Sequence, residues 1–223
     1  MIYIPEIVQK IRAYYGEVLD YHRYKTVHDQ LFALSKHMHQ GLSQGKEALY
    51  AELNNYNPDY IGKEHSLLKE MTFSIEDCKK TIALEFGFES WQHVEQNKNV
   101  SINHDFEYAL DLLLNGYIQS LRALLDQYPS LINATSHYGH QAQLIHYAGS
   151  NGVEFWRQVV PKNLSDGISL LIEKGADLSS TMKVYGGRFT MQQLFETSAH
   201  PHGAGIFEEV KNMLDSYINQ HNG

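Results

Sequence analysis

Ser198 and His200 are close enough in the sequence to suggest a nucleophile and its general base. A serine hydroxyl becomes a good nucleophile only when a base within hydrogen-bond reach removes its proton. Proximity in sequence does not establish that geometry, and the G-x-S-x-G turn of many serine hydrolases is absent. The acidic pairs Glu76-Asp77 and Glu208-Glu209 open predicted helices, where the helix dipole accounts for them. We therefore predict no catalytic residues and favour a protein that is not an enzyme.

Histidines occur in two pairs with i, i+2 spacing, His37 with His39 and His200 with His202. The first pair falls in a predicted helix, where side chains two residues apart diverge. The second falls in a loop, where a metal ion would need further ligands from elsewhere in the fold. Cys78 is the single cysteine, so neither an intrachain disulfide nor a Cys-rich zinc site is expected. We expect no metal and no cofactor.

Four residues of the middle of the chain are candidates for binding: Tyr147, Asn151, Glu154 and Arg157. Glu154 and Arg157 are three residues apart and can pair on one helical turn. A solvated surface pair is our favoured interpretation, and a binding role is the alternative.

A second set of candidates lies in two loops nearer the C-terminus. Tyr185 and Gly187 flank a glycine in the sequence Tyr-Gly-Gly, where backbone can approach a ligand closely. Our favoured interpretation is that the same residues form a hairpin tip that needs positive φ, with Gly187 as a structural glycine. They are not a P-loop, because no G-K-[S/T] follows. His200 belongs to the loop at residues 198–205.

Apolar spacing predicts helices through most of the chain and little or no sheet. Residues 24–42 carry an apolar stripe of period 3.6, formed by Val27, Leu31, Leu34 and Met38. Ser74 is a predicted N-cap, and its helix runs through a buried Cys78 to about Gly87. Ser90 is the predicted cap of a further short helix. Polar residues 96–101 mark a boundary between an N-terminal helical region, 1–99, and a second region, 100–223.

The second region predicts short paired helices. Helices at residues 106–114 and 118–128 join at Asn115-Gly116, and Pro129 stops the second helix. Such a two-helix unit cannot bury its apolar face alone, so a neighbouring unit must stack on it.

Residues 143–152, Q-L-I-H-Y-A-G-S-N-G, resemble the first helix of an ankyrin repeat, T-P-L-H-x-A followed by Asn-Gly. Residues 169–178, S-L-L-I-E-K-G-A-D-L, resemble the end of its second helix. Upstream, residues 82–91 resemble a helix–turn–helix that precedes ankyrin units in uncharacterised bacterial proteins. The resemblance covers roughly residues 104–220. It implies structural roles for His146, which in that family bonds to neighbouring backbone, and for the turn glycines Gly152 and Gly175.

The expected fold is therefore all-α. It has an N-terminal helical bundle followed by a short ankyrin-like helical solenoid, a degenerate ankyrin-repeat domain of two and a half to three units. Its second unit is long, because the equivalent exits Asn133 and Ser179 stand 46 residues apart, whereas an ankyrin unit has about 33 residues. The excess lies at residues 153–164, and insertions in solenoids often map to the binding face.

The composition of the chain argues against some classes of binding partner. The net charge of −8, with 18 Lys and Arg spread along the chain, argues against nucleic acid or an anionic membrane. The N-terminus lacks the basic start and apolar run of a signal peptide, and no stretch is long enough to span a membrane. We expect a cytoplasmic location.

The leading functional expectation is a non-catalytic binding or scaffold protein. It recognises a protein or peptide partner through an ankyrin-like surface. The alternative is a small-molecule-binding protein or enzyme. Its pocket is formed by the 153–164 insertion, the loop at residues 185–187 and the loop at residues 198–205. An antitoxin or immunity-type inhibitor also fits the acidic charge, but no motif points to it.

Overall fold

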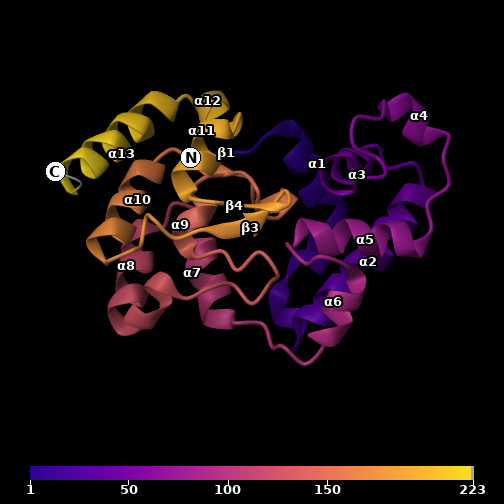
Figure 1. Ribbon diagram of the computed structural model, residues 1–223, viewed down its shortest axis with the longest axis horizontal. Helices are drawn as coiled ribbons and strands as arrows, with labels where there is room; N and C mark the ends of the chain where they lie inside the picture. The colour runs from indigo at the N-terminus through magenta and orange to yellow at the C-terminus, as the bar shows by residue number, and fades with distance from the viewer. Residues whose placement is uncertain (222–223) are drawn as a thin grey trace.

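The computed structural model describes residues 1–221, and most of them are helical (Figure 1). The N-terminal helices lie on one side of the molecule and the C-terminal half on the other, with α1 (Glu6–Tyr15) between them. Val8 of α1 packs into the core of the C-terminal half, whereas Ile11 and Tyr15 pack into the core of the N-terminal half. One helix therefore contributes to both cores.

The N-terminal half is a bundle in which α2 packs along α5. Its helices after α1 are α2 (Val27–Ser43), α3 (Ala48–Tyr56), α4 (His65–Lys69), α5 (Ile75–Glu85) and α6 (Trp91–Gln96). Short 3-10 segments, η1 (Gly16–Leu19) and η2 (Tyr21–Arg23), connect α1 to α2. The predicted stripe of α2 is buried, as is Cys78 of α5.

Side-chain caps begin several of these helices. Ser74 accepts a hydrogen bond from the N–H of Asp77, whose carboxylate accepts one from the Ser74 N–H, so that α5 begins with a reciprocal capping box. Ser90 caps α6 by accepting from the N–H of His93. Both caps confirm the positions predicted from the sequence.

The C-terminal half consists of shorter helices. They are α7 (His104–Leu114), α8 (Ile118–Gln127), η3 (Pro129–Asn133), α9 (Leu144–Tyr147), η4 (Phe155–Arg157), α10 (Leu164–Glu173), α11 (Met191–Thr197), α12 (His200–Ala204) and α13 (Phe207–His221). The turn between α7 and α8 uses Gly116 at φ 71°, a conformation that favours glycine. α7 packs against α8, and the 3-10 segment that follows α8 begins at Pro129.

Two small antiparallel sheets add to the helices. β1 (Ile2–Tyr3) pairs with β2 (Val160–Pro161), so the start of the chain is bound to the middle of the C-terminal half. β3 (Met182–Val184) and β4 (Gly187–Phe189) form a hairpin whose tip has Tyr185 at φ 52° and Gly186 at φ 74°. Positive φ at both central residues is the pattern of a type I′ turn. Gly187, the predicted structural glycine of this loop, lies outside the positive-φ positions and begins β4.

The 153–164 segment lies at the junction of the two halves. Its residues Phe155 and Trp156 pack into the N-terminal core, while Val159 and Val160 pack into the C-terminal core. The expectation that this insertion forms an exposed binding face is therefore wrong, because its apolar side chains are used to join the two cores.

Backbone contacts tighten the same junction. The N–H of His140 donates to the carbonyl of Phe86 at 3.1 Å. A Cβ on Gly87 would lie 2.2 Å from the nitrogen of His140, so only glycine fits there. Among the described residues, no helix has the length and apolar character needed to cross a membrane.

Candidate functional site

Glu154 and Arg157 form a buried ion pair, which corrects the favoured prediction of a solvated one. Nη1 of Arg157 donates to Oε1 of Glu154 at 3.1 Å, and the Glu154 side chain is 0% exposed. The pair is buried because Phe155 and Trp156, which lie between its two members and belong to η4, pack into the apolar core. The residue types alone predicted an ion pair exposed to solvent. The tertiary packing of Phe155 and Trp156 buries that pair instead.

Three further side chains complete this network. Nη2 of Arg157 pairs with Glu107 of α7, and the hydroxyl of Tyr147 donates to Oε1 of Glu154 at 3.2 Å. Nδ1 of His140 accepts from the N–H of Ala142, so Nε2 carries the proton and points to Glu154 at 3.4 Å. Burial opposes the charge of Glu154, but Arg157 and then the His140 hydrogen bond lower the pKa of Glu154 to about 2.

This buried network has a structural role. Burial raises the pKa of Glu107 while Arg157 opposes that rise, so one guanidinium serves two carboxylates. Removing one partner would leave an uncompensated buried charge. Arg157 reaches a small cavity of about 340 Å³ beside η1, η2 and α7, but Glu154 and Tyr147 are fully enclosed.

A second buried acidic cluster lies where the bundle meets the 153–157 segment. Glu52 of α3 and Glu85 of α5 are both buried here, and the hydroxyl of Tyr15 donates to Glu52 at 2.9 Å. The N–H of Phe155 donates to Oε1 of Glu85 at 2.8 Å. Burial and then the charge of Glu52 raise the pKa of Glu85 well above its usual range, while burial raises the pKa of Glu52 to about 7. No local pattern in the sequence points to this pair, because both residues stand in ordinary helical stretches.

The remaining predicted binding residues take no part in the buried network, and they are Asn151, Tyr185 and His200. The hydroxyl of Tyr185 donates to Oδ1 of Asn151 at 3.1 Å, and Nδ2 of Asn151 donates to Thr197. The imidazole Nε2 of His200 bonds to Oε1 of Gln158 at 3.1 Å, and it is the backbone N–H of His200 that donates to Oγ of Ser198, at 3.3 Å. The Ser198 hydroxyl donates to the carbonyl of Ser150, so these two residues do not form a nucleophile–base pair.

Two of the predicted structural residues, Gly152 and Gly175, lie in turns, whereas His146 lies in α9 and Gly187 in β4. His146 accepts from the N–H of Gln143 at Nδ1, and its Nε2 contacts the carbonyl of Ser180 at 3.0 Å. Gly152 and Gly175 adopt φ of 70° and 89°. A Cβ on Gly152 would also lie 2.9 Å from the Val184 side chain.

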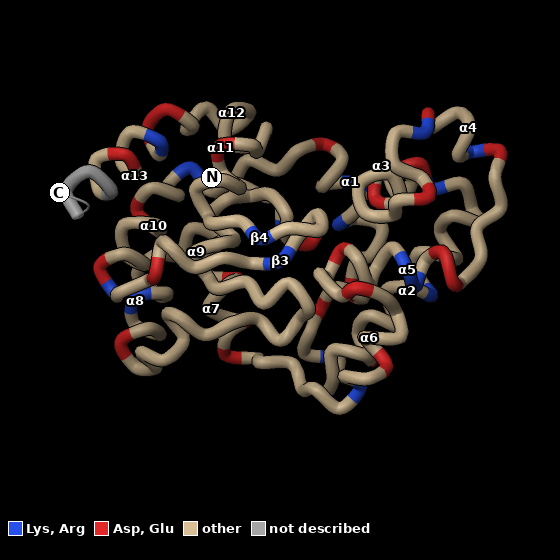
Figure 2. The backbone as a smooth tube through the Cα atoms, in the orientation of Figure 1, with Lys and Arg blue, Asp and Glu red and all other residues tan. Residues whose placement is uncertain are grey.

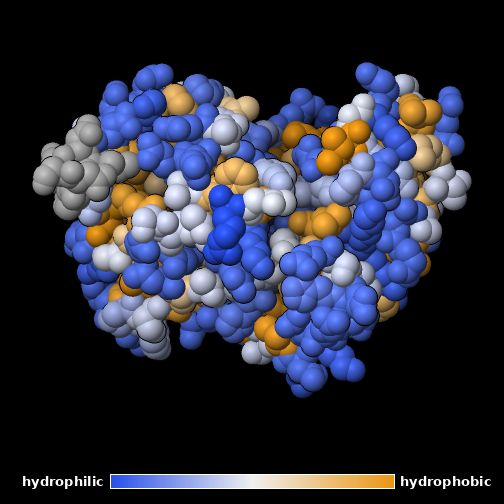
Figure 3. All heavy atoms as spheres, viewed as in Figure 1, coloured by the Kyte–Doolittle hydropathy of each residue, from blue (hydrophilic) through white to orange (hydrophobic). Residues whose placement is uncertain are grey.

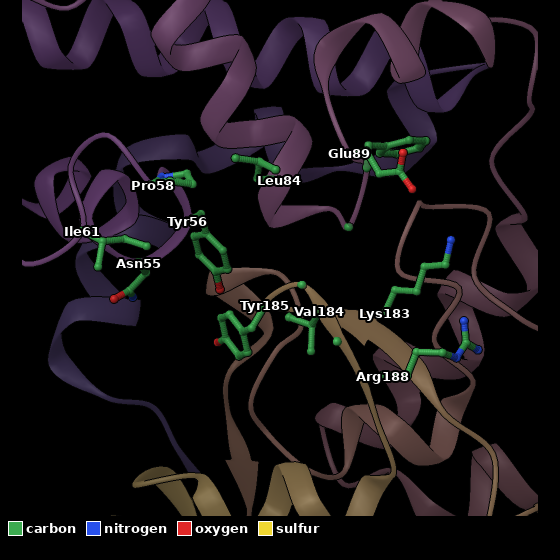
Figure 4. Close-up of a pocket in the computed structure, with 14 residues that line it drawn as sticks. Asn55, Tyr56, Pro58, Ile61, Leu84, Glu89, Lys183, Val184, Tyr185 and Arg188 are labelled. Carbon is green, nitrogen blue, oxygen red and sulfur yellow. The ribbon is translucent and has the colours of Figure 1, made fainter.

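A cleft of about 750 Å³ lies between the N-terminal bundle and the β3–β4 hairpin (Figure 4). Of the predicted binding residues, Tyr185 alone lines it, together with the loop glycine Gly187. The cleft is lined by Asn55, Tyr56, Pro58, Ile61, Leu84, Gly87, Phe88, Glu89, Lys183, Val184, Tyr185, Gly186, Gly187 and Arg188. Neither the 153–164 insertion nor the loop at residues 198–205 lines this cleft, although both were predicted to form a pocket with the Tyr185 loop. The facing wall is formed by residues 55–61 and 84–89 instead.

Apolar side chains remain exposed at this cleft. Ile61 is 60% exposed and Tyr185 is 56% exposed. Figure 3 shows apolar surface gathered where the two halves of the molecule meet. Sequence reasoning missed the bundle side of the cleft because no local pattern links residues 55–61 to a hairpin more than a hundred residues later.

No histidine or cysteine is among the lining residues of the cleft. Glu89 is the one acid among its lining residues, and it is exposed. Within residues 1–221, no group of three or more His, Cys, Asp or Glu side chains is arranged to hold a metal ion. The arrangement can bind a ligand through apolar contact and a few polar groups.

No protein-family model, curated protein or solved structure matches this chain.

Proposed function

We propose that this chain is a non-catalytic binding protein whose ligand lies in the cleft between the N-terminal bundle and the β3–β4 hairpin. The observation that carries the proposal is the cleft itself, about 750 Å³ in volume. Ligand sites commonly measure about 300–1,000 Å³ and combine a mostly apolar lining with a few polar groups. This cleft has the same character, and its size fits a small organic molecule.

The position of the cleft supports binding by a preformed surface. One wall belongs to the bundle and the other to the hairpin tip, and the buried 153–160 segment holds the two halves together behind it. If residues 104–220 form ankyrin-type units, as their motifs predict, the β3–β4 tip is one of the projecting hairpins through which such units bind. A rigid junction reduces the entropy lost when a ligand binds.

A neutral naphthalene dye tests the proposal directly. N-phenyl-1-naphthylamine fluoresces in apolar surroundings, and we expect the full-length protein to bind it. Ile61→Asp should weaken binding by about tenfold, because it places a charge against the apolar wall of the cleft. Leu67→Asp is the matched control, since Leu67 is 50% exposed on α4 and does not line the cleft. The proposal fails if the dye does not bind, or if both variants bind it equally.

Recognition of a protein partner by the C-terminal half is a second candidate. Three tyrosines on or beside α7 and α8 are exposed, namely Tyr108 (48%), Tyr117 (61%) and Tyr128 (42%). Exposed aromatic residues are enriched in protein interfaces. Crosslinking in an extract of the native host should yield a partner whose yield falls in Tyr108→Ser/Tyr117→Ser and not in Ile61→Asp. Equal yields from the two would remove this candidate.

A further inference from the structure

The cleft has two chemically different ends. Pro58, Ile61 and Leu84 form an apolar end on the bundle side, with the ring of Tyr56 beside them (Figure 4). Lys183 and Arg188 project together at the other end, one from β3 and one from β4. They are cross-strand partners in the hairpin, so the pleat holds both side chains on the same face.

Neither of these cations is neutralised within the described part of the chain. No carboxylate of residues 1–217 lies within 4 Å of Lys183 or Arg188. Figure 2 shows the two basic positions side by side on β3 and β4, in a chain whose net charge is −8. Within residues 1–217, this end of the hairpin therefore carries two positive charges without a carboxylate partner, although the protein as a whole is acidic.

The Arg188 guanidinium is also held in position. Its Nε donates to Oγ1 of Thr181 at 2.9 Å and its Nη2 donates to the Thr181 carbonyl at 3.0 Å. Neither contact neutralises the charge, and Nη1 stays free to donate. Across the cleft, Glu89 supplies one opposing negative charge, which leaves a net positive charge at this end.

We infer that the ligand of this cleft is a small amphipathic organic anion, with its acidic group at Lys183 and Arg188 and its apolar body against Ile61 and Leu84. This inference rests on the proposed function, since it names the class of ligand for the same site. Guanidinium and ammonium groups bind carboxylate, sulfonate or phosphate through charge-assisted hydrogen bonds. A neutral apolar ligand would leave both cations unused.

Two dyes that share one aromatic body separate the inference from the proposed function. N-phenyl-1-naphthylamine is neutral, and 8-anilino-1-naphthalenesulfonate carries the same rings with an added sulfonate. We expect the anionic dye to bind more tightly to the native protein, and its affinity alone to fall as NaCl is raised. Lys183→Gln/Arg188→Gln should lower the affinity for the anionic dye by about tenfold and leave the affinity for the neutral dye unchanged.

Two further variants control for net charge and folding. Lys25→Gln/Lys98→Gln removes the same charge from exposed positions away from the cleft, and both dyes should bind it as they bind the native protein. Glu89→Gln removes the opposing charge, and the anionic dye should bind about twofold more tightly.

The outcomes are distinguishable. If neither dye binds the native protein, the proposed function fails together with this inference. If the neutral dye binds, but the anionic dye binds no better and does not respond to Lys183→Gln/Arg188→Gln, the inference alone is overturned. Equal losses in the cleft and control double variants would also overturn it, because they would reflect net charge and not a site.

Discussion

Nη1 of Arg157 donates a hydrogen bond to Oε1 of Glu154 across 3.1 Å, and neither side chain is more than 6% exposed. The same guanidinium pairs with Glu107 of α7, so one positive charge joins the junction segment to the C-terminal half. Charges removed from water are costly unless they are paired and hydrogen-bonded. The junction that holds the two halves together behind the cleft therefore depends on a single buried cation.

Arg157→Met should destabilise the fold strongly, because it leaves Glu107 and Glu154 buried without a cation. The expected loss in unfolding free energy is about 3–5 kcal/mol in urea titrations. Arg122→Met is the control, since Arg122 pairs with Glu173 on the exposed surface, where water screens both charges and the loss should be much smaller.

A companion variant keeps this test informative if Arg157→Met does not fold. Glu107→Gln/Glu154→Gln/Arg157→Met removes all three charges together and should recover much of the lost stability. If the triple variant is no more stable than Arg157→Met, uncompensated charge is not the cause of the loss.

The buried pair Glu52 and Glu85 should make stability fall as the pH rises. Burial raises the pKa of Glu85 well above its usual range and that of Glu52 to about 7. The folded state therefore binds more protons than the unfolded state above about pH 4.5. The contribution of the protonated pair is complete below that pH and is lost as the pH passes through 7.

Urea titrations at pH 5, 6, 7 and 8 measure this effect. Glu52 alone should lower the unfolding free energy by on the order of 2–3 kcal/mol over that range, and Glu85 should add to the fall. Glu52→Gln/Glu85→Gln should flatten the pH dependence, because neither amide titrates. The variant should keep the fold, because the amide oxygens still accept from Tyr15 and from the Phe155 N–H. Glu89→Gln, at an exposed position, should leave the slope unchanged. A slope that persists in the double variant would contradict the assignment.

Glu154 acts in the opposite direction and at lower pH. Its pKa of about 2 in the folded protein lies below the ordinary value of 4.5. Its stabilising contribution is therefore present above about pH 4.5 and is lost as the pH falls toward 2. Together the two clusters place the stability maximum near pH 5, and a maximum above pH 8 would contradict the assignment of Glu52 and Glu85.

Gly87→Ala should weaken the contact between the two halves. Gly87 has φ 75°, and a Cβ there would lie 2.2 Å from the backbone nitrogen of His140. Gly62→Ala is a matched control, because Gly62 has φ 76° and no atom within 4 Å of the added Cβ. Backbone strain should cost each variant about 1 kcal/mol, and the clash should add at least about 2 kcal/mol to Gly87→Ala alone. Equal losses, measured by thermal or urea unfolding, would show that the close approach is unimportant.

Local chemistry made parts of this fold predictable. The stripe from Val27 to Met38 and the caps at Ser74 and Ser90 depend on residues within a few positions of each other, and the structure has them where the sequence places them. Hydrophobic spacing and capping are local signals, so they survive in a single sequence. The ankyrin-type arrangement of the second half stays a prediction.

The site was harder to predict, because its contacts join distant segments. The spacing of Glu154 and Arg157 predicted a pair on the surface. The pair is buried because Phe155 and Trp156 pack into the core. Tyr185 does line the cleft, but its facing wall comes from residues 55–61. The pairing of that loop with the hairpin is decided by tertiary packing, which no short pattern encodes.

Tyr185→Asn should separate folding from binding at the hairpin tip. Tyr185 has φ 52° and is followed by Gly186 at φ 74°, and asparagine before glycine is the preferred sequence for such a turn. We expect the variant to be at least as stable as the native protein in urea, within about 0.5 kcal/mol, although it loses the hydrogen bond to Asn151. Binding of N-phenyl-1-naphthylamine should nevertheless weaken several-fold, because the Tyr185 ring no longer covers the cleft. Unchanged dye binding would show that Tyr185 is only a turn residue, whereas a large loss of stability would show that its ring is needed for folding. The expected combination of a stable hairpin and weaker binding would indicate that this strained tyrosine contributes to the ligand site.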